Sequence, residues 1–348
     1  MKPTMAQTPP VRWTMAALLA VALAIGGREI RAQTNELPVP AHRGVPKPDG
    51  PAGGLKVLHW AGFQSAVTYT FDDALPSQIR DYPQLKATGV RMTFFLACNN
   101  DGNATVWTQM ARDGNELGNH TEHHCRANAT GCAWGAYAGS LEAEYDLCSE
   151  HIEQSYGVRA VWTTASPYGD TGYDTVAQSR FFLNRGVQRG QVAPGDSSDA
   201  FNLPVYGAVA GDTAAVFNGC IDAAHAAGNW QIFLFHSFGQ DHGYAPVQVA
   251  EVVASIEHAK SLGDVWIDSM ENVGAYWMGE RALAHAAIKK SGRNTILTWR
   301  LPPHFPPGKY LRVTVSGGRL TQQGRLLAWN DAGYYEVALD AGSLTIAP

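Results

Sequence analysis

The sequence predicts an α/β protein with a parallel sheet or barrel, followed by a small all-β module. Between residues 66 and about 280, short runs of apolar, β-branched and aromatic residues alternate with segments whose apolar residues recur every three or four positions. Strands and helices that alternate in this way are typical of parallel strands with helices outside them. After Gly292 the helical spacing disappears, and short strand-like runs are separated by Pro, Gly and Asn-Asp.

The first 32 residues have the pattern of a signal peptide. Arg12 precedes the apolar run 15–25, and a small-residue cleavage point follows at Ala32. The run is shorter than a comfortable membrane span and has the size of a signal-peptide core. We therefore expect a secreted or periplasmic protein with no stable membrane span once the signal is removed. An uncleaved membrane anchor is the alternative.

The rest of the chain suits one barrel-sized domain with a small appendage. Residues 33–60 are rich in Pro and Gly and indicate a linker or lead-in. The barrel domain is then expected at 61–285 and the β module at 292–348. The formal net charge of -5 argues against nucleic acid as a partner, because proteins that bind nucleic acid present basic patches.

Each expected element follows from its local composition. Six segments of the barrel region are rich in β-branched and aromatic residues and are expected to be strands: 66–71, 92–97, 158–166, 202–209, 230–236 and 265–269. Five segments between them have apolar residues at helical spacing: 77–88, 106–113, 141–156, 214–227 and 246–262. In the β module the expected strands are 295–300, 310–316, 325–329, 334–339 and 343–347.

The strand at 66–71 ends in two adjacent carboxylates, Asp72 and Asp73. Barrel enzymes carry their reacting groups at the carboxyl ends of the strands. Because successive residues of an extended chain point in opposite directions, the two acids need not share a role. One could hold a metal while the other acts as a base. The alternative is that they only end the strand and begin a turn.

A histidine cluster at 118–124 is the second polar feature. His120 and His124 are four residues apart, a spacing that lets two imidazoles converge on one metal ion. His120 and His123 are three apart and could share a face instead, and a histidine-rich surface turn is the alternative without a metal. One carboxylate and two imidazoles would leave positions on a divalent ion for water and substrate.

Two other expected strands end in polar groups. After the first, Pro167 and Gly169 fix a tight turn that could hold the backbone N–H of Tyr168 outward as an oxyanion donor. His236 ends the apolar strand 230–236 and could act as a general acid if it lies at the same edge as the acids. Otherwise this histidine is a satisfied residue of the core or rim.

Taken in order, these motifs resemble the polysaccharide deacetylase family, the NodB-homology carbohydrate esterases. The resemblance spans about residues 66–280 and is carried by Thr70-Phe71-Asp72-Asp73, His120-Thr121-x-x-His124, Ser166-Pro167-Tyr168 and Leu234-x-His236. It implies a distorted (β/α) barrel and a divalent metal, usually zinc. Carried over residue by residue, it implies Asp73, His120 and His124 as metal ligands, Asp72 as the base, Tyr168 as the backbone donor and His236 as the acid. Segments 203–207, 241–244 and 264–266 resemble a bacterial secreted subgroup, some of whose members carry a small C-terminal β module.

The activity implied by this resemblance is hydrolysis of acetyl groups from an acetylated polysaccharide or oligosaccharide. An N-acetylated glucosamine polymer and an O-acetylated xylan are both open as substrates. One alternative is a carbohydrate-binding protein that has the same fold and weak or no turnover. Another is a metal-dependent amidohydrolase that acts on an amide outside carbohydrates.

The chain departs from the family pattern at one position. The family usually has an Arg two residues before the Pro-Tyr pair, where it keeps the catalytic Asp ionised and oriented, and this chain has Ala165. Arg185 or Arg189 could supply the missing cation; otherwise the base is weaker. The family's aspartate partner of the catalytic His is also unassigned, and the candidates are Asp196, Asp199 and Asp212.

The chain has five cysteines, so at least one is unpaired if the others form the disulfides expected of an exported protein. Their connectivity stays open. Cys125 follows the histidine cluster, and a thiolate metal ligand is the alternative for it. Asn119 begins a formal glycosylation sequon, but a glycan there would crowd the metal site, so we expect it to be unmodified. The cysteines are Cys98, Cys125, Cys132, Cys148 and Cys220.

Overall fold

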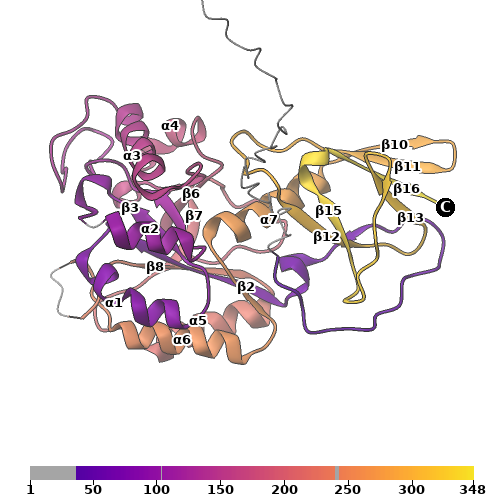
Figure 1. The fold of residues 1–348 in the computed structure, drawn as a ribbon, viewed down its shortest axis with the longest axis horizontal. Helices are drawn as coiled ribbons and strands as arrows, with labels where there is room; N and C mark the ends of the chain where they lie inside the picture. Colours follow the sequence, from indigo (N-terminus) through magenta and orange to yellow (C-terminus); the bar gives the residue numbers. More distant parts are fainter. Residues whose placement is uncertain (1–36, 103, 240–242) are drawn as a thin grey trace, which may run out of the picture. The chain divides into compact units, whose positions relative to one another are not determined.

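The computed structural model describes residues 37–102, 104–239 and 243–348 (Figure 1). The predicted signal peptide lies outside these residues, as do Asp241 and His242 of the subgroup motif. Within the described part of the chain, no helix combines the length and the apolar character needed to cross a membrane.

Seven parallel strands close into a barrel. β2 pairs with β8 on one edge and with β3 on the other, so the strand order β2-β3-β4-β5-β6-β7-β8 returns to its start. β9 (Val265–Ile267) adds to the first half of β2, on the edge that β3 occupies further along. The β6–β7 register shifts between Arg185 and Arg189 and makes the ring irregular. The predicted distorted (β/α) barrel is thus confirmed. Its strands are β2 (Ser65–Asp72), β3 (Thr93–Leu96), β4 (Glu116–Asn119), β5 (Thr163–Ala165), β6 (Leu183–Arg189), β7 (Leu203–Gly207) and β8 (Trp230–Phe235).

Helices follow the strands and pack on the outside of the barrel (Figure 1). Local signals set the ends of two of these helices. Pro76 is the first residue of α1, and the hydroxyl of Ser140 accepts a hydrogen bond from the N–H of Ala143 at the start of α3. Gly157 ends α3 in the left-handed conformation that glycine adopts most easily. The helices are α1 (Pro76–Ala87), α2 (Ala104–Arg112), α3 (Leu141–Tyr156), α4 (Asp174–Gln178), α5 (Ala214–Ala227), α6 (Val249–Ser261) and α7 (Met270–Ala284).

Side chains of β2 alternate between two environments and so place its last residue. Val67, Tyr69 and Phe71 belong to the apolar cluster that the strands share with the surrounding helices. Because successive residues of a strand point in opposite directions, Thr70 and then Asp72 face the interior of the barrel. Asp72 is also the last residue of the strand, so its carboxylate lies inside the barrel at its carboxyl end.

Among the elements that the sequence patterns did not predict, β6 and α7 have an atypical composition. β6 contains Asn184, Arg185, Gln188 and Arg189, which broke the apolar pattern expected of a barrel strand. α7 has apolar residues on most of its circumference, since it is buried on several sides, so no clear stripe marked it. The predicted strand at 158–166 was too long, because only Thr163–Ala165 join the sheet as β5.

The C-terminal region forms two antiparallel sheets. One has the order β10-β11-β16-β13-β14, and the other has the order β1-β12-β15. β1 (Lys56–Val57) comes from the segment predicted as a lead-in and pairs with β12, so that segment contributes a strand to the β module. The C-terminal strands are β10 (Ala287–Ser291), β11 (Asn294–Thr298), β12 (Tyr310–Thr314), β13 (Arg319–Gln322), β14 (Arg325–Leu326), β15 (Tyr335–Ala338) and β16 (Ser343–Ala347).

The β module shares its core with the barrel. Leu311, Val313 and Leu339 pack in the same apolar cluster as Trp277 of α7 and Ala66 of β2. The buried guanidinium of Arg312 donates to the carbonyls of Pro38 and Ala61 and so ties the lead-in to the module. The apolar core is therefore continuous across the domain boundaries expected at residues 60, 285 and 292, and those boundaries stay predictions.

Candidate active site

The carboxyl ends of neighbouring barrel strands bring together all six residues that the sequence proposed for the site. Asp72 ends β2, and His236 directly follows β8, whose Phe235 is the register partner of Phe71 on β2. His120 directly follows β4, and Tyr168 lies in the turn after β5. Sequence segments more than 150 residues apart thus meet at one edge of the barrel.

The three proposed metal ligands form one cluster. The ligand atoms of Asp73, His120 and His124 all lie within 4.8 Å of one another. The Nε2 atoms of His120 and His124 each lie 3.4 Å from Oδ1 of Asp73. All three side chains are buried. His120 also approaches the second acid, with Nε2 3.6 Å from Oδ2 of Asp72.

The two histidines are held in different ways. Nδ1 of His120 donates to the carbonyl of Ala165 on β5 at 2.6 Å, which leaves the lone pair of Nε2 facing Asp73. Nδ1 of His124 is buried and has no hydrogen-bond partner within the described residues. Aromatic rings hold His124 instead: the ring centroids of Trp134 and Tyr168 lie 5.3 Å and 4.5 Å from that of the imidazole.

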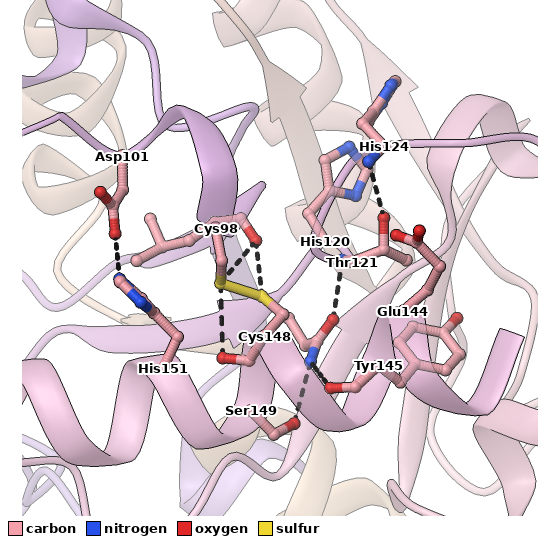
Figure 2. Close-up of a disulfide and its surroundings, with 12 residues drawn as sticks. Cys98, Asp101, His120, Thr121, His124, Glu144, Tyr145, Cys148, Ser149 and His151 are labelled. Atoms are coloured by element: carbon pink, nitrogen blue, oxygen red, sulfur yellow. Dashed lines mark hydrogen bonds and ion pairs between the residues drawn. A yellow bond between two sulfur atoms is a disulfide. The ribbon is translucent and has the colours of Figure 1, made fainter. Parts of the chain in front are cut away.

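His123 does not join the cluster. Its Nδ1 lies 3.1 Å from Oε1 of Glu144, and its backbone N–H donates to the other oxygen of the same carboxylate at 2.9 Å. Of the two histidine pairs that the spacing left open, the geometry therefore selects His120 and His124. Figure 2 shows their side chains beside Thr121 and Glu144.

Several residues in the ligand cluster and next to it have a strained backbone. Asp73, Thr121, His124 and Tyr168 have φ angles of 80°, 66°, 51° and 60°, in the left-handed region that residues with a Cβ rarely adopt. Each such residue costs on the order of 1–3 kcal/mol unless its surroundings impose the conformation. Strain of this kind gathers at sites where the position of a side chain matters more than the stability of a turn.

Burial and charge set the proton affinities of the cluster. Burial raises the pKa of Asp73, but its contact with His120 and the neighbouring histidines outweigh that effect and bring the pKa down to about 2. Burial lowers the pKa of His124 to about 3, assisted by His120. Burial opposes protonation of His120, yet the carboxylates of Asp72 and Asp73 raise its pKa. Asp73 as an anion and His124 as a neutral imidazole are the forms that bind a metal ion.

Arg185 takes the place of the family arginine that this chain lacks at position 165. Its Nη2 pairs with Oδ2 of Asp72, and both side chains are buried. Ala165 of β5 and Arg185 of β6 are register partners, so the guanidinium enters the site at the expected height from the adjacent strand. Arg189, the other candidate, lies over the ring of Tyr206 at 4.4 Å from the ring centroid. Of the two candidate cations, Arg185 is therefore the one that pairs with Asp72.

His236 has no aspartate partner within the described residues. Its Nδ1 is buried without a hydrogen bond, and burial lowers its pKa against the effect of Asp72 and Asp73. The three candidate partners were wrong, because each carboxylate accepts hydrogen bonds from its own loop. Asp196 accepts from the N–H of Ala193, Asp199 from the N–H of Phe201, and Asp212 from the N–H of Val209.

Two disulfides flank the ligand segment, and they join Cys98 to Cys148 and Cys125 to Cys132. Cys125 is therefore no thiolate ligand, and Cys220 is the unpaired cysteine. Figure 2 shows the first disulfide, which links Cys98 in the loop after β3 to Cys148 on α3. The same view shows His120 and His124.

The second disulfide closes a loop directly after His124. In this loop the carbonyl of Gly131 accepts the hydroxyl of Tyr168, and the guanidinium of Arg126 covers the same ring at 4.1 Å. The loop thus supports the ring that packs on His124. Asn119 is fully buried and donates to the carbonyl of Tyr145, so its sequon is not accessible to modification.

The residues of the cluster fit a divalent metal. Oδ1 of Asp73 is buried without a hydrogen bond within the described residues, and two imidazole nitrogens face it. One carboxylate oxygen and two imidazoles are the donor set of catalytic zinc sites, with positions left open for other ligands. A second group of potential ligands, Cys98, Glu122 and Cys148, is excluded because its two sulfurs form a disulfide.

Residues 63–182 match the family model of polysaccharide deacetylase. No curated protein is similar enough to count as a match. Similar solved structures include the Xyl-CE4 domain of a multidomain xylanase from the hindgut metagenome of Trinervitermes trinervoides, a family 4 acetyl xylan esterase from Clostridium thermocellum with a cobalt ion, and a mutant peptidoglycan deacetylase from Bacillus subtilis. They are 19%, 17% and 17% identical to the chain, with TM-scores of 0.40, 0.41 and 0.40. Each match covers 60% of this chain and 88%, 89% and 89% of the respective structure.

The segment matched by the family model contains Asp72, Asp73, His120, His124 and Tyr168, and it ends before Arg185 and His236. The order of these residues along the chain and their convergence at one end of a parallel barrel agree with that match. Residues 63–182 are therefore similar to the polysaccharide deacetylase family.

Proposed function

We propose that the protein is a secreted or periplasmic, metal-dependent deacetylase that removes acetyl groups from an acetylated polysaccharide. The observation that carries this proposal is that two adjacent carboxylates have different partners. Asp73 faces two imidazoles, whereas Asp72 is paired with Arg185. The first arrangement suits a metal ligand and the second suits a base held in a fixed orientation.

Asp73, His120 and His124 would hold the ion, which is zinc in the simplest form of the proposal. A divalent ion there would supply Lewis-acid activation of water and of the acetyl carbonyl. Asp72 would accept the proton from the attacking water, because its carboxylate lies next to the ligand cluster and keeps Oδ1 free of hydrogen bonds within the described residues. Arg185 holds the other oxygen and so fixes the direction of the free one.

Tyr168 would stabilise the oxyanion with its backbone N–H. The residue has a left-handed conformation, and its ring contacts the imidazole of His124 and the guanidinium of Arg126. A donor fixed in advance in this way is worth about 3 kcal/mol to the transition state of acyl transfer. The side chain of Tyr168 would therefore have a structural role, which is to hold this backbone in place. Only the backbone would contact the reacting atoms.

His236 would protonate the departing amine or alkoxide. Its ring lies near the acids, and burial lowers its pKa, which makes its protonated form a stronger acid. The reaction then yields acetate and a deacetylated sugar. N-acetylated glucosamine polymers and O-acetylated xylan both present the acetyl carbonyl that this arrangement needs.

The competing hypothesis is a carbohydrate-binding protein with the same fold and weak or no turnover. Its support in the sequence was Ala165, and the ion pair between Arg185 and Asp72 removes that support. The unpartnered Nδ1 of His236 is the observation that still favours it, because the acid lacks a carboxylate to orient it within the described residues. A non-sugar amide as substrate would use the same chemistry and differ only in the ligand.

Acetate release by the purified mature chain tests the proposal. Zinc-loaded and chelator-treated protein would be given chitooligosaccharide, peptidoglycan, acetylated xylan and a small non-sugar amide, with Asp73→Ala as the matched inactive variant. Release from one of the glycans that stops on chelation, returns with zinc and is absent in Asp73→Ala supports the deacetylase and names its substrate class. Stoichiometric zinc without release from any glycan would favour the binding protein.

A further inference from the structure

The backbone ends of the two strands that carry Asp72 and His236 are joined by one side chain. Gln78, in the first turn of α1, is fully buried. Its Nε2 donates at 2.5 Å to the carbonyl of Asp72 and at 2.8 Å to the carbonyl of His236. Because both neighbours are carbonyl acceptors, the orientation of the amide is fixed with its NH₂ toward them.

The amide of Gln78 bridges β2 and β8 just past the last register pair of the two strands. The β2–β8 ladder ends with the register pair Phe71 and Phe235, so Asp72 and His236 are the next residues of the two chains. Beyond that pair, β2 and β8 have no further register partners in each other, and the chain after β2 turns sharply, with φ of 80° at Asp73. The two N–H bonds of Gln78 take the place of the missing ladder bonds.

The position of Gln78 on α1 is unusual for a polar residue. It lies on the buried stripe with Tyr82 and Leu85, at spacings of four and three, which an apolar side chain would fill in a purely structural helix. Its Oε1 is buried without a hydrogen bond within the described residues. A buried unpaired oxygen costs about 1–3 kcal/mol, so stability alone would favour an apolar residue here.

The same turn of α1 makes a second link to the loop that follows β8. The hydroxyl of Ser77 accepts the N–H of Phe238 at 3.0 Å. The carbonyl of Asp73 is held separately, by Nδ2 of Asn100 at 2.8 Å. Gln78 is thus the described side chain that ties Asp72 directly to His236, whereas Asn100 acts on the proposed metal ligand.

We propose that Gln78 is a positioning residue that fixes the separation between the base Asp72 and the acid His236 across the β2–β8 seam. The inference rests on the proposed function, since it assigns Gln78 to the same reaction. Gln78 touches neither substrate nor metal and acts through the backbone of the two groups. Loss of its two hydrogen bonds releases both strand ends and lets the acid and the base drift apart.

The matched control is Gln231, a buried glutamine at the opposite end of the same seam. Its Nε2 donates to the carbonyl of Ile232, and its Oε1 accepts from Gln191. Gln78→Met and Gln231→Met each replace a buried amide with an apolar side chain of similar length. Gln78→Glu is the second test variant, because it keeps the shape and removes the donors even if the methionine variant folds poorly.

The experiment measures kcat, KM, zinc content and melting temperature for the wild type and the three variants. Gln78→Met and Gln78→Glu are expected to lose on the order of 10- to 100-fold in kcat with KM and zinc content nearly unchanged, as for a misplacement of about 1 Å. Gln231→Met is expected to lose stability with kcat close to wild type. A kcat of the Gln78 variants that matches Gln231→Met overturns the inference while the proposed function stands.

A readout independent of turnover separates the two proposals. Crystal structures of wild type and Gln78→Met are expected to differ in the separation of the Asp72 and His236 backbones. Superimposable positions would overturn the inference whether or not the protein is active. If the wild type releases no acetate, the proposed function fails, and this structural comparison alone decides the role of Gln78.

Discussion

The two ends of the barrel bury carboxylates in opposite ways. At the amino end, Glu116 opens β4 and accepts three hydrogen bonds, from the hydroxyls of Thr93 and Thr163 and from the N–H of Glu271 at the start of α7. At the carboxyl end, Oδ1 of Asp72 and Oδ1 of Asp73 are buried and have no hydrogen bond within the described residues. The carboxylates are buried at both ends, but only that of Glu116 has hydrogen-bond partners for both of its oxygens within the described residues.

This difference teaches how to separate structure from function among buried charges. A buried polar group normally finds its partners inside the protein, and Glu116 does so with strands, helix and loop together. Groups that stay unpaired at a strand end, next to imidazoles and with strained backbones, are left open for something that the protein binds.

Removal of a proposed metal ligand should have the largest effect. Asp73→Ala and His120→Ala should lose bound zinc and acetate release together, because two donors do not retain a catalytic zinc ion. Zinc content by mass spectrometry and acetate release measure the two losses in the same samples. Full zinc occupancy in either variant would show that the ion is held elsewhere.

Asp72→Asn should separate binding of the metal from turnover. The amide keeps the shape of the side chain but accepts no proton, so zinc content should stay near wild type while kcat falls by about 100- to 10,000-fold. Near-normal rates in this variant would show that Asp72 is not the base. The comparison with Asp73→Ala matters most, because the two acids are adjacent in sequence and differ only in their surroundings.

Arg185→Met should weaken both the reaction and the fold. It leaves Asp72 buried without its cation, and breaking a buried ion pair from one side costs about 3–5 kcal/mol. We expect a large fall in kcat and a lower melting temperature, with zinc content largely retained. Arg189→Met is the control, since that side chain lies on Tyr206 and should affect kcat little. Equal kcat losses in both variants would remove the special role of Arg185.

Glu116→Gln should change the pH dependence of stability without changing the reaction. Burial, assisted by the charge of Glu271, raises the pKa of Glu116 in the folded protein. The unfolded chain therefore loses this proton at a lower pH than the folded one, so Glu116 makes stability fall as the pH rises from its usual pKa to the raised one. The decrease in melting temperature between pH 4.5 and pH 8 should be smaller in Glu116→Gln than in wild type. Identical drops would contradict this assignment.

His123→Ala should have the smallest effect. The side chain pairs with Glu144 rather than with the ligand cluster, so zinc content and kcat should stay within about twofold of wild type. A large loss of zinc would transfer the ligand role from His124 to His123. Run beside His120→Ala, this variant tests whether the geometry chose the correct pair from the cluster.

The sequence by itself determined the elements that carry chemistry and the order of their motifs. Asp72 and Asp73 mark the end of an apolar strand, and strand ends of a parallel barrel must meet at one edge, so a site there was predictable from local patterns. The alternation of strands and helices likewise predicted a parallel sheet or barrel, because periodicity depends only on neighbouring residues, and the family resemblance implied the barrel. His120 and His124 also followed from spacing, although His123 kept the pair open.

Only the tertiary structure decided which groups serve those motifs. Arg185 lies on a strand too polar to be recognised, and its role depends on its register with Ala165, a relation between chain segments that no local pattern encodes. Gln78 is one polar residue in a helical stripe until the fold brings the carbonyls of Asp72 and His236 to its amide. The contacts that orient the site join residues far apart in the sequence, so no local pattern predicts them. The proposed reacting residues lie at the ends of strands, and local patterns predict where those strands end.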